Sequence, residues 1–436
     1  MDVAIITIGD ELLIGQVVDT NSAWLGKLLN DNGFRVVHKA AIGDNEQDII
    51  SAIDAANKMA PLILITGGLG PTKDDITMRT LCQYYGCKLH FSEEVYQNIE
   101  RFFMKNGRAM NELTRNQAIV PDGCTVIQNH VGTAPCTWYE RDGHILISMP
   151  GVPSEMKWLM TNEILPRLSK RFKQDLHILH RTFWVNGYSE SALAIKLSDF
   201  ENNLPSFVKL AYLPQLGVMR LRLSAYTLHE KEVENAISIL QHQLEELLAG
   251  NMIADGDNNL EIIVGEKLRS MGQTIGTAES CTGGSIAALI TSVAGSSDYF
   301  VGSVVAYANA IKQQVLGVSE SDLKKYGAVS RQVVEQMAKG ALRVLDCDWS
   351  IATSGIAGPG GGTPEKPVGT IWVAVANKNK VISQKYHFNT TREQNIQRTV
   401  NMALMLLLEM LNESNIIQKK NIIFDVYKQT VKHVRP

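Results

Sequence analysis

A turn with the sequence AESCTGG, from Ala278 to Gly284, is the strongest candidate for nucleophilic chemistry. An apolar strand pattern precedes this turn and a helical pattern follows it. The turn contains Ser280, Cys281, Thr282, Gly283 and Gly284. Small residues leave backbone N–H groups exposed, so such a strand-to-helix turn can hold a phosphate or an oxyanion. The alternative is commoner: serine and threonine before a helix often serve only as caps.

A second segment, YFVGSVVAYANAIKQQVLGV, places Tyr307, Asn309 and Lys312 after a strand and at the start of a helix. A single lysine is by default exposed to solvent. If Lys312 is buried beside Ser280, desolvation lowers its pKa, and the neutral amine can take the hydroxyl proton, as in serine–lysine amidases.

A third segment, SIATSGIAGPGGGTPEKPVGTIWVAVA, predicts two strands around a glycine- and proline-rich loop from Gly355 to Gly369. Such loops usually turn the chain, but their main-chain N–H groups also bind phosphates. Arg392 and Arg398 follow as possible phosphate partners. These segments in one domain, from about Glu261 to Glu413, indicate a nucleotide-like ligand.

The amino-terminal part has its own candidate site in TGGLGPTKDDIT, which follows the apolar strand LILI. A loop with this composition allows close backbone approach to an anionic ligand at the edge of a parallel sheet. Asp74 and Asp75 come next, and paired carboxylates beside such a loop suit a divalent cation. The alternative is that both carboxylates serve a helix dipole. The candidate ligand-binding residues of the loop are Gly67, Gly68, Gly70 and Thr72.

Short apolar runs alternate with helical patterns in the first third of the chain, which predicts parallel strands joined by helices in a three-layer α/β domain that ends near Phe172. The first helix, around Ser22 to Asn30, has Thr20 or Asn21 available as a cap. From Leu176 to about Gly256, two helices and alternating strands predict a small α+β module. We therefore expect domains at 1–172, 173–256 and 257–413, with an extension at 414–436 that could pack on a partner chain or stay loose.

The composition is that of a globular protein with 45% hydrophobic residues and a formal net charge of -3. No long run of one charge suggests direct nucleic-acid binding. The first residues have neither a basic region nor an uninterrupted apolar run, so we expect a cytoplasmic protein without a membrane span. The six cysteines have no metal-ligand spacing and are expected to be reduced packing residues.

The carboxy-terminal segments resemble the corresponding domain of the CinA family, the nicotinamide mononucleotide deamidase that also occurs alone as PncC. The resemblance rests on TAESCTGG, VAYANAIK, SGIAGP, KPVGT and the GAVS motif at Gly327 to Ser330. It implies that Ser280 is the nucleophile and Lys312 the general base, with Tyr307 in the same site. Cys281 is the rival nucleophile, because a thiol beside a helix N-terminus can ionise more readily than a hydroxyl.

The same resemblance assigns further residues to the substrate. It implies a turn that receives phosphate or oxyanion at Thr282, Gly283 and Gly284, and a nucleotide cradle at Ser354, Gly355 and the following loop. Asn309, Arg392 and Arg398 complete the expected substrate-binding set. No cofactor is expected for this amide hydrolysis.

The amino-terminal segments resemble the molybdopterin-binding fold of MoaB, MogA and the MoeA core, and more closely the amino-terminal domain of the CinA family. That resemblance implies a metal-dependent ADP-ribose pyrophosphatase, with Asp75 and Asp74 near a divalent metal ion. Glu11, Asn21 and Glu155 are expected around the ligand. Cys136 stands where relatives usually have glycine, and its side chain could crowd a phosphate and weaken this activity.

The middle module resembles the KH-like insert of the family, but lacks a GXXG clamp for RNA, so we expect it to be a spacer. The chain as a whole is predicted to be a bifunctional, homodimeric enzyme that acts on nicotinamide mononucleotide and ADP-ribose. The alternatives are an interaction protein associated with competence or recombination and a molybdopterin-handling protein.

Overall fold

The chain folds into two compact units. The computed structural model describes residues 1–436 except 73–74, 108, 173–176, 228–229, 257 and 433–436, and it omits the side chains of Glu230 and residues 414–432. The first unit comprises Met1–Leu179 with Tyr226–Glu234, and the second comprises His180–Ala225 with Asn235–Pro436.

A six-stranded sheet in the order β2-β1-β3-β8-β7-β6 forms the centre of the first unit. The parallel part consists of β1 (Asp2–Ile8), β2 (Arg35–Ile42), β3 (Leu62–Thr66) and β8 (His144–Met149). The antiparallel edge consists of β7 (Cys136–Arg141) and β6 (Thr125–Ile127). A separate two-stranded sheet pairs β4 (Leu89–Phe91) with β5 (Ile119–Pro121).

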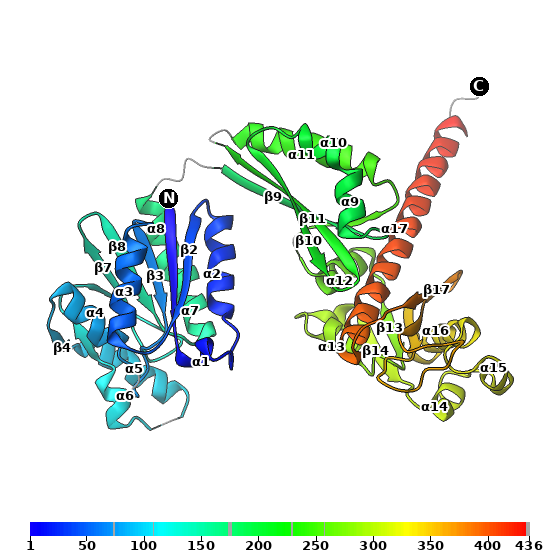
Figure 1. Cartoon of the computed structure of the whole chain (residues 1–436). Coiled ribbons are helices and arrows are strands. Elements are labelled where there is room, and N and C mark those ends of the chain that lie inside the picture. The colour runs from blue at the N-terminus through cyan, green and yellow to red at the C-terminus, as the bar shows by residue number, and fades with distance from the viewer. Residues whose placement is uncertain (73–74, 108, 173–176, 228–229, 257, 433–436) are drawn as a thin grey trace. The chain divides into compact units, whose positions relative to one another are not determined.

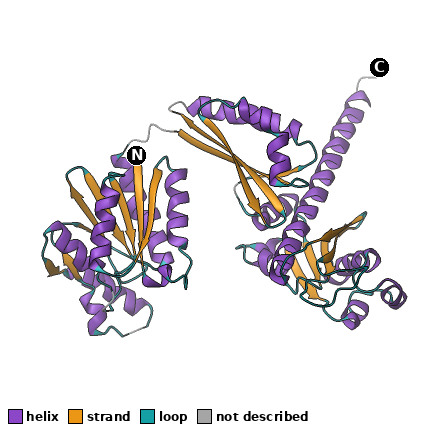
Figure 2. Cartoon of the chain, viewed as in Figure 1, coloured by secondary structure: helices purple, strands orange, loops and turns teal. Residues whose placement is uncertain are grey.

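Helices cover both faces of this central sheet (Figures 1 and 2). The helices of the first unit are α1 (Asp10–Leu13), α2 (Thr20–Asp31), α3 (Glu46–Asn57), α4 (Thr77–Tyr85), α5 (Glu93–Lys105), α6 (Glu112–Asn116), α7 (Pro153–Leu159), the π-helix η1 (Met160–Ile164) and α8 (Leu165–Arg171).

Side chains along a strand point alternately to the two faces of the sheet, which explains why helices pack on both faces. In β1, Val3 and Ile5 pack against α2, α7 and α8, whereas Ala4 and Ile6 pack against α3 and α4. Because successive strand residues point to opposite faces, a strand that is apolar throughout must be covered on both. The predicted three-layer α/β domain is confirmed.

The cap of α2 differs from the prediction. Asp19 is the N-cap, and its Oδ1 accepts a hydrogen bond of 2.9 Å from the Ser22 N–H. Asp19 Oδ2 also accepts a bond from the Thr7 hydroxyl. Aspartate is a strong cap, and here it ties the helix to β1. Thr20 and Asn21 therefore belong to the first turn, and Asn21 is free to point at the sheet edge.

The second unit begins with the small α+β module, whose sheet has the order β10-β11-β9-β12. Its strands are β9 (His177–Val185), β10 (Val208–Gln215), β11 (Val218–Thr227) and β12 (Met252–Asp255). Its helices are α9 (Glu190–Lys196), α10 (Ser198–Asn202) and α11 (Glu230–Leu247).

The rest of the second unit is built on a five-stranded sheet in the order β14-β13-β15-β16-β17. Its strands are β13 (Ile275–Glu279), β14 (Phe300–Val305), β15 (Trp349–Gly355), β16 (Thr370–Asn377) and β17 (Val381–His387). The helices are α12 (Leu260–Met271), α13 (Ser285–Thr291), the 3-10 helix η2 (Ser296–Asp298), α14 (Asn309–Gln314), α15 (Glu320–Tyr326), α16 (Arg331–Leu345) and α17 (Arg392–Lys432).

The two faces of this sheet differ in residue size. Ala278, Ala352 and Ala374 face the cluster that contains α16, whereas Ile351 and Val373 face the cluster that contains α12 and α17. Small side chains let α16 pack close to the strands. The strands β13 and β14 run parallel, so their carboxyl ends meet at one edge.

Helix α17 forms hydrogen bonds with the small α+β module of the second unit. Glu409 accepts a hydrogen bond of 3.0 Å from Asn186, and Asn401 donates one of 2.9 Å to the Leu216 carbonyl. Asn412 donates to the Ile253 carbonyl. The helix backbone continues to Lys432, so the carboxy-terminal extension prolongs α17.

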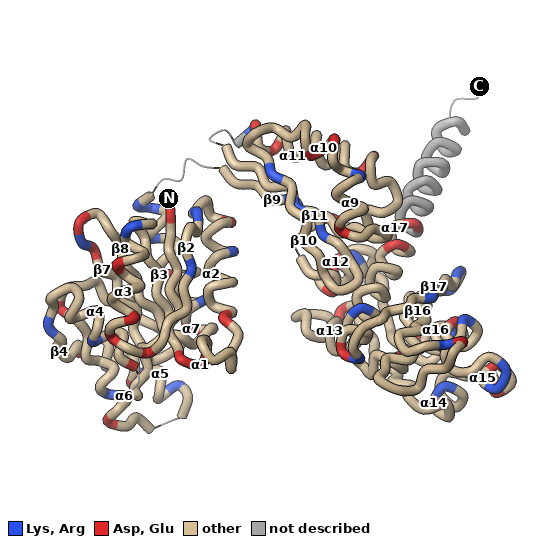
Figure 3. Tube along the Cα trace, in the orientation of Figure 1, with Lys and Arg blue, Asp and Glu red and all other residues tan. Residues whose placement is uncertain are grey.

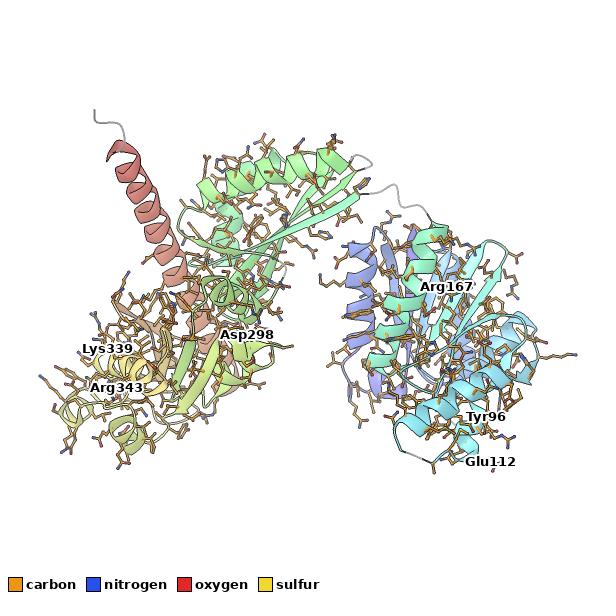
Figure 4. All side chains as sticks on the ribbon, turned by 180° about the vertical axis from the view of Figure 1, so that it is seen from behind. Tyr96, Glu112, Arg167, Asp298, Lys339 and Arg343 are labelled. Carbon is orange, nitrogen blue, oxygen red and sulfur yellow. The ribbon has the colours of Figure 1, made fainter. Side chains whose placement is uncertain are left out.

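Acidic and basic residues are interspersed along the backbone of both units (Figure 3). Surface pairs include Arg167 with Glu163 and Arg269 with Asp298. Figure 4 labels one member of each pair, Arg167 and Asp298. Such exposed pairs contribute only about 0–1 kcal/mol each. Among the described residues, no helix combines the length and apolar character needed to cross a membrane.

Candidate functional site

Ser280 and Lys312 meet at the edge where β13 and β14 end. Lys312 Nζ lies 3.1 Å from Ser280 Oγ. The lysine is on α14, is only 1% exposed, and also donates to the carbonyls of Ala306 at 2.7 Å and Tyr307 at 3.1 Å. The structure thus brings together the two residues that the sequence places 32 positions apart.

The surroundings of Lys312 favour a neutral amine. Burial lowers its pKa, because desolvation penalises the charged ammonium. A neutral amine has two N–H donors, which match the two carbonyls of Ala306 and Tyr307. Its one lone pair is then available to accept the hydroxyl proton of Ser280. This arrangement suits a general base.

Cys281 is poorly placed to attack. Its side chain is only 7% exposed, and burial raises the pKa of its thiol to about 12, although a contact with Thr353 works in the opposite direction. A thiol with that pKa is protonated at neutral pH and is a weak nucleophile. The raised pKa contradicts the expectation that the helix N-terminus makes this thiol ionise easily.

The backbone of the AESCTGG turn is less open than predicted. Glu279, which is 0% exposed, accepts hydrogen bonds from the N–H groups of Gly284 at 3.0 Å, Ile286 at 3.1 Å and Ala287 at 2.9 Å. The protein's own carboxylate therefore occupies the start of α13, where the sequence predicted a phosphate. Glu279 was not among the predicted site residues, because it lies six residues before the first residue of α13 and matches no standard capping position.

Other polar groups of the turn also have internal partners. The Gly283 N–H donates to the Ser280 carbonyl at 3.2 Å, and the buried Thr282 hydroxyl lies 2.7 Å from the Thr353 hydroxyl. Gly283 and Gly284 have φ values of 61° and 98°, which favour glycine. These glycines and Thr282 shape the turn around Ser280.

Ser354 and Gly355 make contacts within the scaffold. The Ser354 hydroxyl, on a side chain that is 1% exposed, donates to the Ala328 carbonyl at 2.7 Å. A Cβ at Gly355 would lie 2.3 Å from the Ile371 side chain. The SGIAGP motif therefore joins the GAVS segment and β16, and the expected contact of these two residues with a nucleotide stays a prediction.

Arg392 reaches the same edge from the start of α17. It donates to the Gly358 carbonyl at 2.8 Å, and its second nitrogen lies 3.4 Å from the Tyr307 hydroxyl. Tyr307 is 63% exposed, and Asn309 is exposed at the first residue of α14. This edge presents an exposed aromatic ring and a cation beside the Ser280–Lys312 pair.

Arg398 lies elsewhere in the unit. Its guanidinium is 5.9 Å from the centre of the Phe388 ring, and its side chain lies close to Gly217 of the small module. It therefore packs at the junction with the small module. The prediction that it contacts a phosphate together with Arg392 is not supported by this position.

The amino-terminal loop closes on itself through Asp75. Asp75 Oδ2 accepts from the Thr72 N–H at 2.9 Å and from its hydroxyl at 2.6 Å, and a Cβ at Gly70 would meet this carboxylate at 2.5 Å. Gly67 and Gly68 have φ values of 118° and 64°. Asp74 lies outside the described residues.

Two further carboxylates, which the sequence did not single out, lie near this loop. Asp10 and Asp44 each accept a hydrogen bond from the other's backbone N–H. Burial raises the pKa of Asp44, and the charges of Asp10, Glu11 and Asp75 raise it further. Within the described part of the chain, no three acidic, histidine or cysteine side chains form a metal-binding group.

Asn21 and Glu155 are held by neighbouring loops. Asn21 donates to the Gly151 carbonyl at 2.8 Å, while its own carbonyl oxygen is buried without a hydrogen-bond partner. Glu155 accepts from Asn129 at 2.6 Å and lies against Gly132, and burial raises the pKa of its carboxyl. An unpaired buried acceptor is unusual and suits a ligand that donates.

Cys136 does not face this loop. Its side chain is 0% exposed and packs in the sheet core with Val3, Ile5 and Leu64. The prediction that it crowds a bound phosphate is therefore wrong, because the thiol points into the hydrophobic layer.

Known families match all three parts of the chain. The CinA C-terminal domain matches residues 257–411, the probable molybdopterin binding domain matches residues 4–170, and the damage-inducible protein CinA KH domain matches residues 180–254. These matches confirm the predicted fold of each part.

Similar proteins span nearly the whole chain. A CinA-like protein of Flavobacterium psychrophilum is 42% identical over 412 residues, which cover 93% of this chain and 98% of the relative. A CinA-like protein of Cytophaga hutchinsonii is 42% identical over 94% of this chain and 98% of its own. The solved structure of competence/damage inducible protein CihA from Agrobacterium tumefaciens is 40% identical, covers 35% of this chain and 93% of its own, and has a TM-score of 0.34.

Proposed function

The chain belongs to the CinA family, and we propose that its carboxy-terminal domain hydrolyses the carboxamide of nicotinamide mononucleotide to nicotinic acid mononucleotide and ammonia. The contact between Lys312 and Ser280 is the main support for this proposal. A buried lysine with a lowered pKa beside a serine hydroxyl is the arrangement that an amide-hydrolysing serine–lysine pair requires.

The first half of the reaction forms an acyl-enzyme. The Lys312 amine takes the hydroxyl proton of Ser280 while Oγ attacks the carboxamide carbon, giving a tetrahedral oxyanion. When this intermediate collapses, the C–N bond breaks and the Lys312 ammonium returns its proton to the leaving nitrogen. Ammonia leaves, and an ester to Ser280 remains.

The second half regenerates the enzyme. A water molecule gives a proton to Lys312 and attacks the ester carbon. The bond from this carbon to Ser280 Oγ then breaks, Oγ takes back the proton from Lys312, and the carboxylic acid product leaves and ionises. In this scheme, water is the one co-reactant.

The exposed groups around the pair suit the rest of this substrate. The nicotinamide ring of the mononucleotide is cationic, and the Tyr307 ring offers an aromatic face to it. Arg392 offers a guanidinium to the 5′-phosphate. Since Glu279 fills the start of α13, we propose that the phosphate binds on the Arg392 side of the site.

The direct test incubates the purified protein with nicotinamide mononucleotide and follows ammonia and nicotinic acid mononucleotide. We expect both products in equal amounts from the wild type and neither from Ser280→Ala. A Ser280→Ala protein with wild-type activity would show that another group attacks.

For the amino-terminal domain we propose hydrolysis of ADP-ribose to AMP and ribose 5-phosphate. Asp44 lies beside Gly68, and the charges of Asp10, Glu11 and Asp75 act on its carboxyl, which supports a cation–pyrophosphate site. Asp44 and Asp75 would hold a divalent ion, which supplies an activated water and neutralises charge on the pyrophosphate. Asn21 and Glu155 would orient the ligand.

Hydrolysis assays with ADP-ribose and a panel of divalent ions test this second activity, with Asp75→Asn as the matched variant. Turnover by the wild type and its loss in the variant are expected. A wild type that is inactive with every ion, yet binds a molybdopterin, would favour the molybdopterin-handling alternative.

A further inference from the structure

We propose that Glu279 is a positioning residue for the nucleophile Ser280, an inference that rests on the proposed amide hydrolysis. Glu279 immediately precedes Ser280 at the end of β13 and is fully buried. A buried carboxylate is costly unless it is well satisfied by hydrogen bonds. Glu279 has four such contacts, and all of them lie on elements that shape the site.

Three of these contacts fix the turn behind Ser280. The N–H groups of Gly284, Ile286 and Ala287 converge on the two carboxylate oxygens at 2.9 to 3.1 Å. Bonds from backbone N–H groups to a carboxylate are shorter and stronger than neutral ones. The start of α13 is thereby fastened to the residue next to the nucleophile, so the turn between them has little freedom.

The fourth contact links the turn to the strand that leads to the base. The Thr277 hydroxyl lies 3.2 Å from Glu279 Oε1 and 2.7 Å from the Ser303 hydroxyl. Ser303 is on β14, and this strand leads to the carbonyls that hold Lys312. Glu279 therefore belongs to a polar group that joins the nucleophile turn and the base-carrying segment.

The bonding of the turn also leaves a defined pair of amides for catalysis. Gly283 donates to the Ser280 carbonyl, and Gly284 donates to Glu279. Within the described part of the chain, the amides of Cys281 and Thr282 donate to no other residue. They are the donors that the turn can offer to the tetrahedral oxyanion, and their directions depend on the same Glu279 anchor.

The variant Glu279→Gln tests this role. Glutamine has nearly the same size as glutamate, but one of its two terminal atoms is an NH₂ donor. It therefore cannot accept all the hydrogen bonds that the carboxylate accepts from the backbone N–H groups. Glu261→Gln is the matched control, because Glu261 is also a buried carboxylate, in the first turn of α12. The primary measurement is the rate at which a fluorophosphonate probe labels Ser280, since this rate does not depend on the natural substrate.

We expect labelling of Glu279→Gln to be about 10- to 100-fold slower than that of the wild type, comparable to the loss of an oxyanion donor. With nicotinamide mononucleotide, kcat falls while KM stays close to the wild-type value, which a merely structural role would not produce. Glu261→Gln keeps the wild-type labelling rate. A folded Glu279→Gln protein that is labelled at the wild-type rate overturns the proposal.

Three further outcomes are informative. If Glu279→Gln does not fold, Thr277→Val removes one contact to Glu279, and it must slow labelling for the proposal to stand. If the wild type is labelled but releases no ammonia from nicotinamide mononucleotide, the proposed substrate is wrong while the positioning role is still measured. A wild type that is not labelled at Ser280 overturns both the proposed amide hydrolysis and the positioning role of Glu279.

Discussion

Lys312 Nζ lies 3.1 Å from Ser280 Oγ because each residue follows one of two adjacent parallel strands. Ser280 comes directly after β13, and Lys312 lies on α14, the helix that follows β14. The contact follows from topology, since parallel strands bring the residues after them to the same sheet edge. In the proposed reaction, this contact makes Lys312 the base that activates Ser280.

Replacing this base should abolish most of the activity. Lys312→Met fills the same apolar space without an amine, so the fold should persist while kcat falls about 10²- to 10⁴-fold, the usual contribution of a general base. The measurement is ammonia release at saturating nicotinamide mononucleotide. The control is Lys339→Ala, an exposed lysine on α16 (Figure 4). A Lys312→Met protein as active as this control would contradict the assignment.

The activity should also depend on pH through Lys312. Its burial places the pKa below the ordinary value of 10.5, and only the neutral amine accepts a proton. kcat/KM should therefore rise with pH, with a midpoint below 10.5. A pH profile of the wild type measures this midpoint, and a midpoint at or above 10.5 would show that the lysine environment is not as described.

The same lowered pKa predicts the pH dependence of stability. Between the lowered pKa and 10.5, the unfolded chain holds a proton on Lys312 more readily than the folded chain does. The free energy of unfolding of the wild type, relative to Lys312→Met, should therefore rise with pH across this window. Urea unfolding of both proteins at several pH values measures this difference in the free energy of unfolding. A difference that falls with increasing pH would contradict the prediction.

Cys281 should be dispensable for the chemistry. Its thiol is buried and its pKa is raised to about 12, so it supplies almost no thiolate at neutral pH. Cys281→Ala should keep kcat near the wild-type value, with a small loss of stability from the lost packing. Steady-state kinetics of Cys281→Ala and of Ser280→Ala show which of the two residues is the nucleophile. Loss of activity in Cys281→Ala alone would reverse the assignment.

Arg392 should determine the preference for a phosphorylated substrate. Arg392→Ala should lower kcat/KM for nicotinamide mononucleotide about 10- to 100-fold, the range for a hydrogen bond to a charged group. Nicotinamide riboside lacks the phosphate and should be affected far less. Arg398→Ala is the control, because Arg398 packs beside Phe388 and Gly217. An equal loss of kcat/KM with both substrates would show that Arg392 does not recognise the phosphate.

The layered fold was predictable because its strands and helices are strongly patterned. Strands such as Leu62–Thr66 are apolar throughout and buried on both faces, and the family motifs lie at their ends. The sequence also indicated Ser280 and Lys312, but it could not show their contact, because that depends on the pairing of β13 with β14.

Residues that bond within the scaffold were harder to assign. Ser354 and Gly355 stand in a glycine-rich motif, yet a bond to Ala328 and close packing on Ile371 explain them. Glu279 was missed because its three amide partners lie five to eight residues further along, around a turn with two positive-φ glycines. Asp44 was missed because it is 34 residues from Asp10 in the sequence, and only the fold brings the two into hydrogen-bond contact.

The most direct test of the proposed reaction is the release of ammonia from nicotinamide mononucleotide by the purified wild-type protein, compared with Ser280→Ala. The proposed serine–lysine mechanism predicts one ammonia for each nicotinic acid mononucleotide formed, and no product from the variant. Absence of product from the folded wild type would contradict the proposed function, and product from Ser280→Ala would contradict the mechanism.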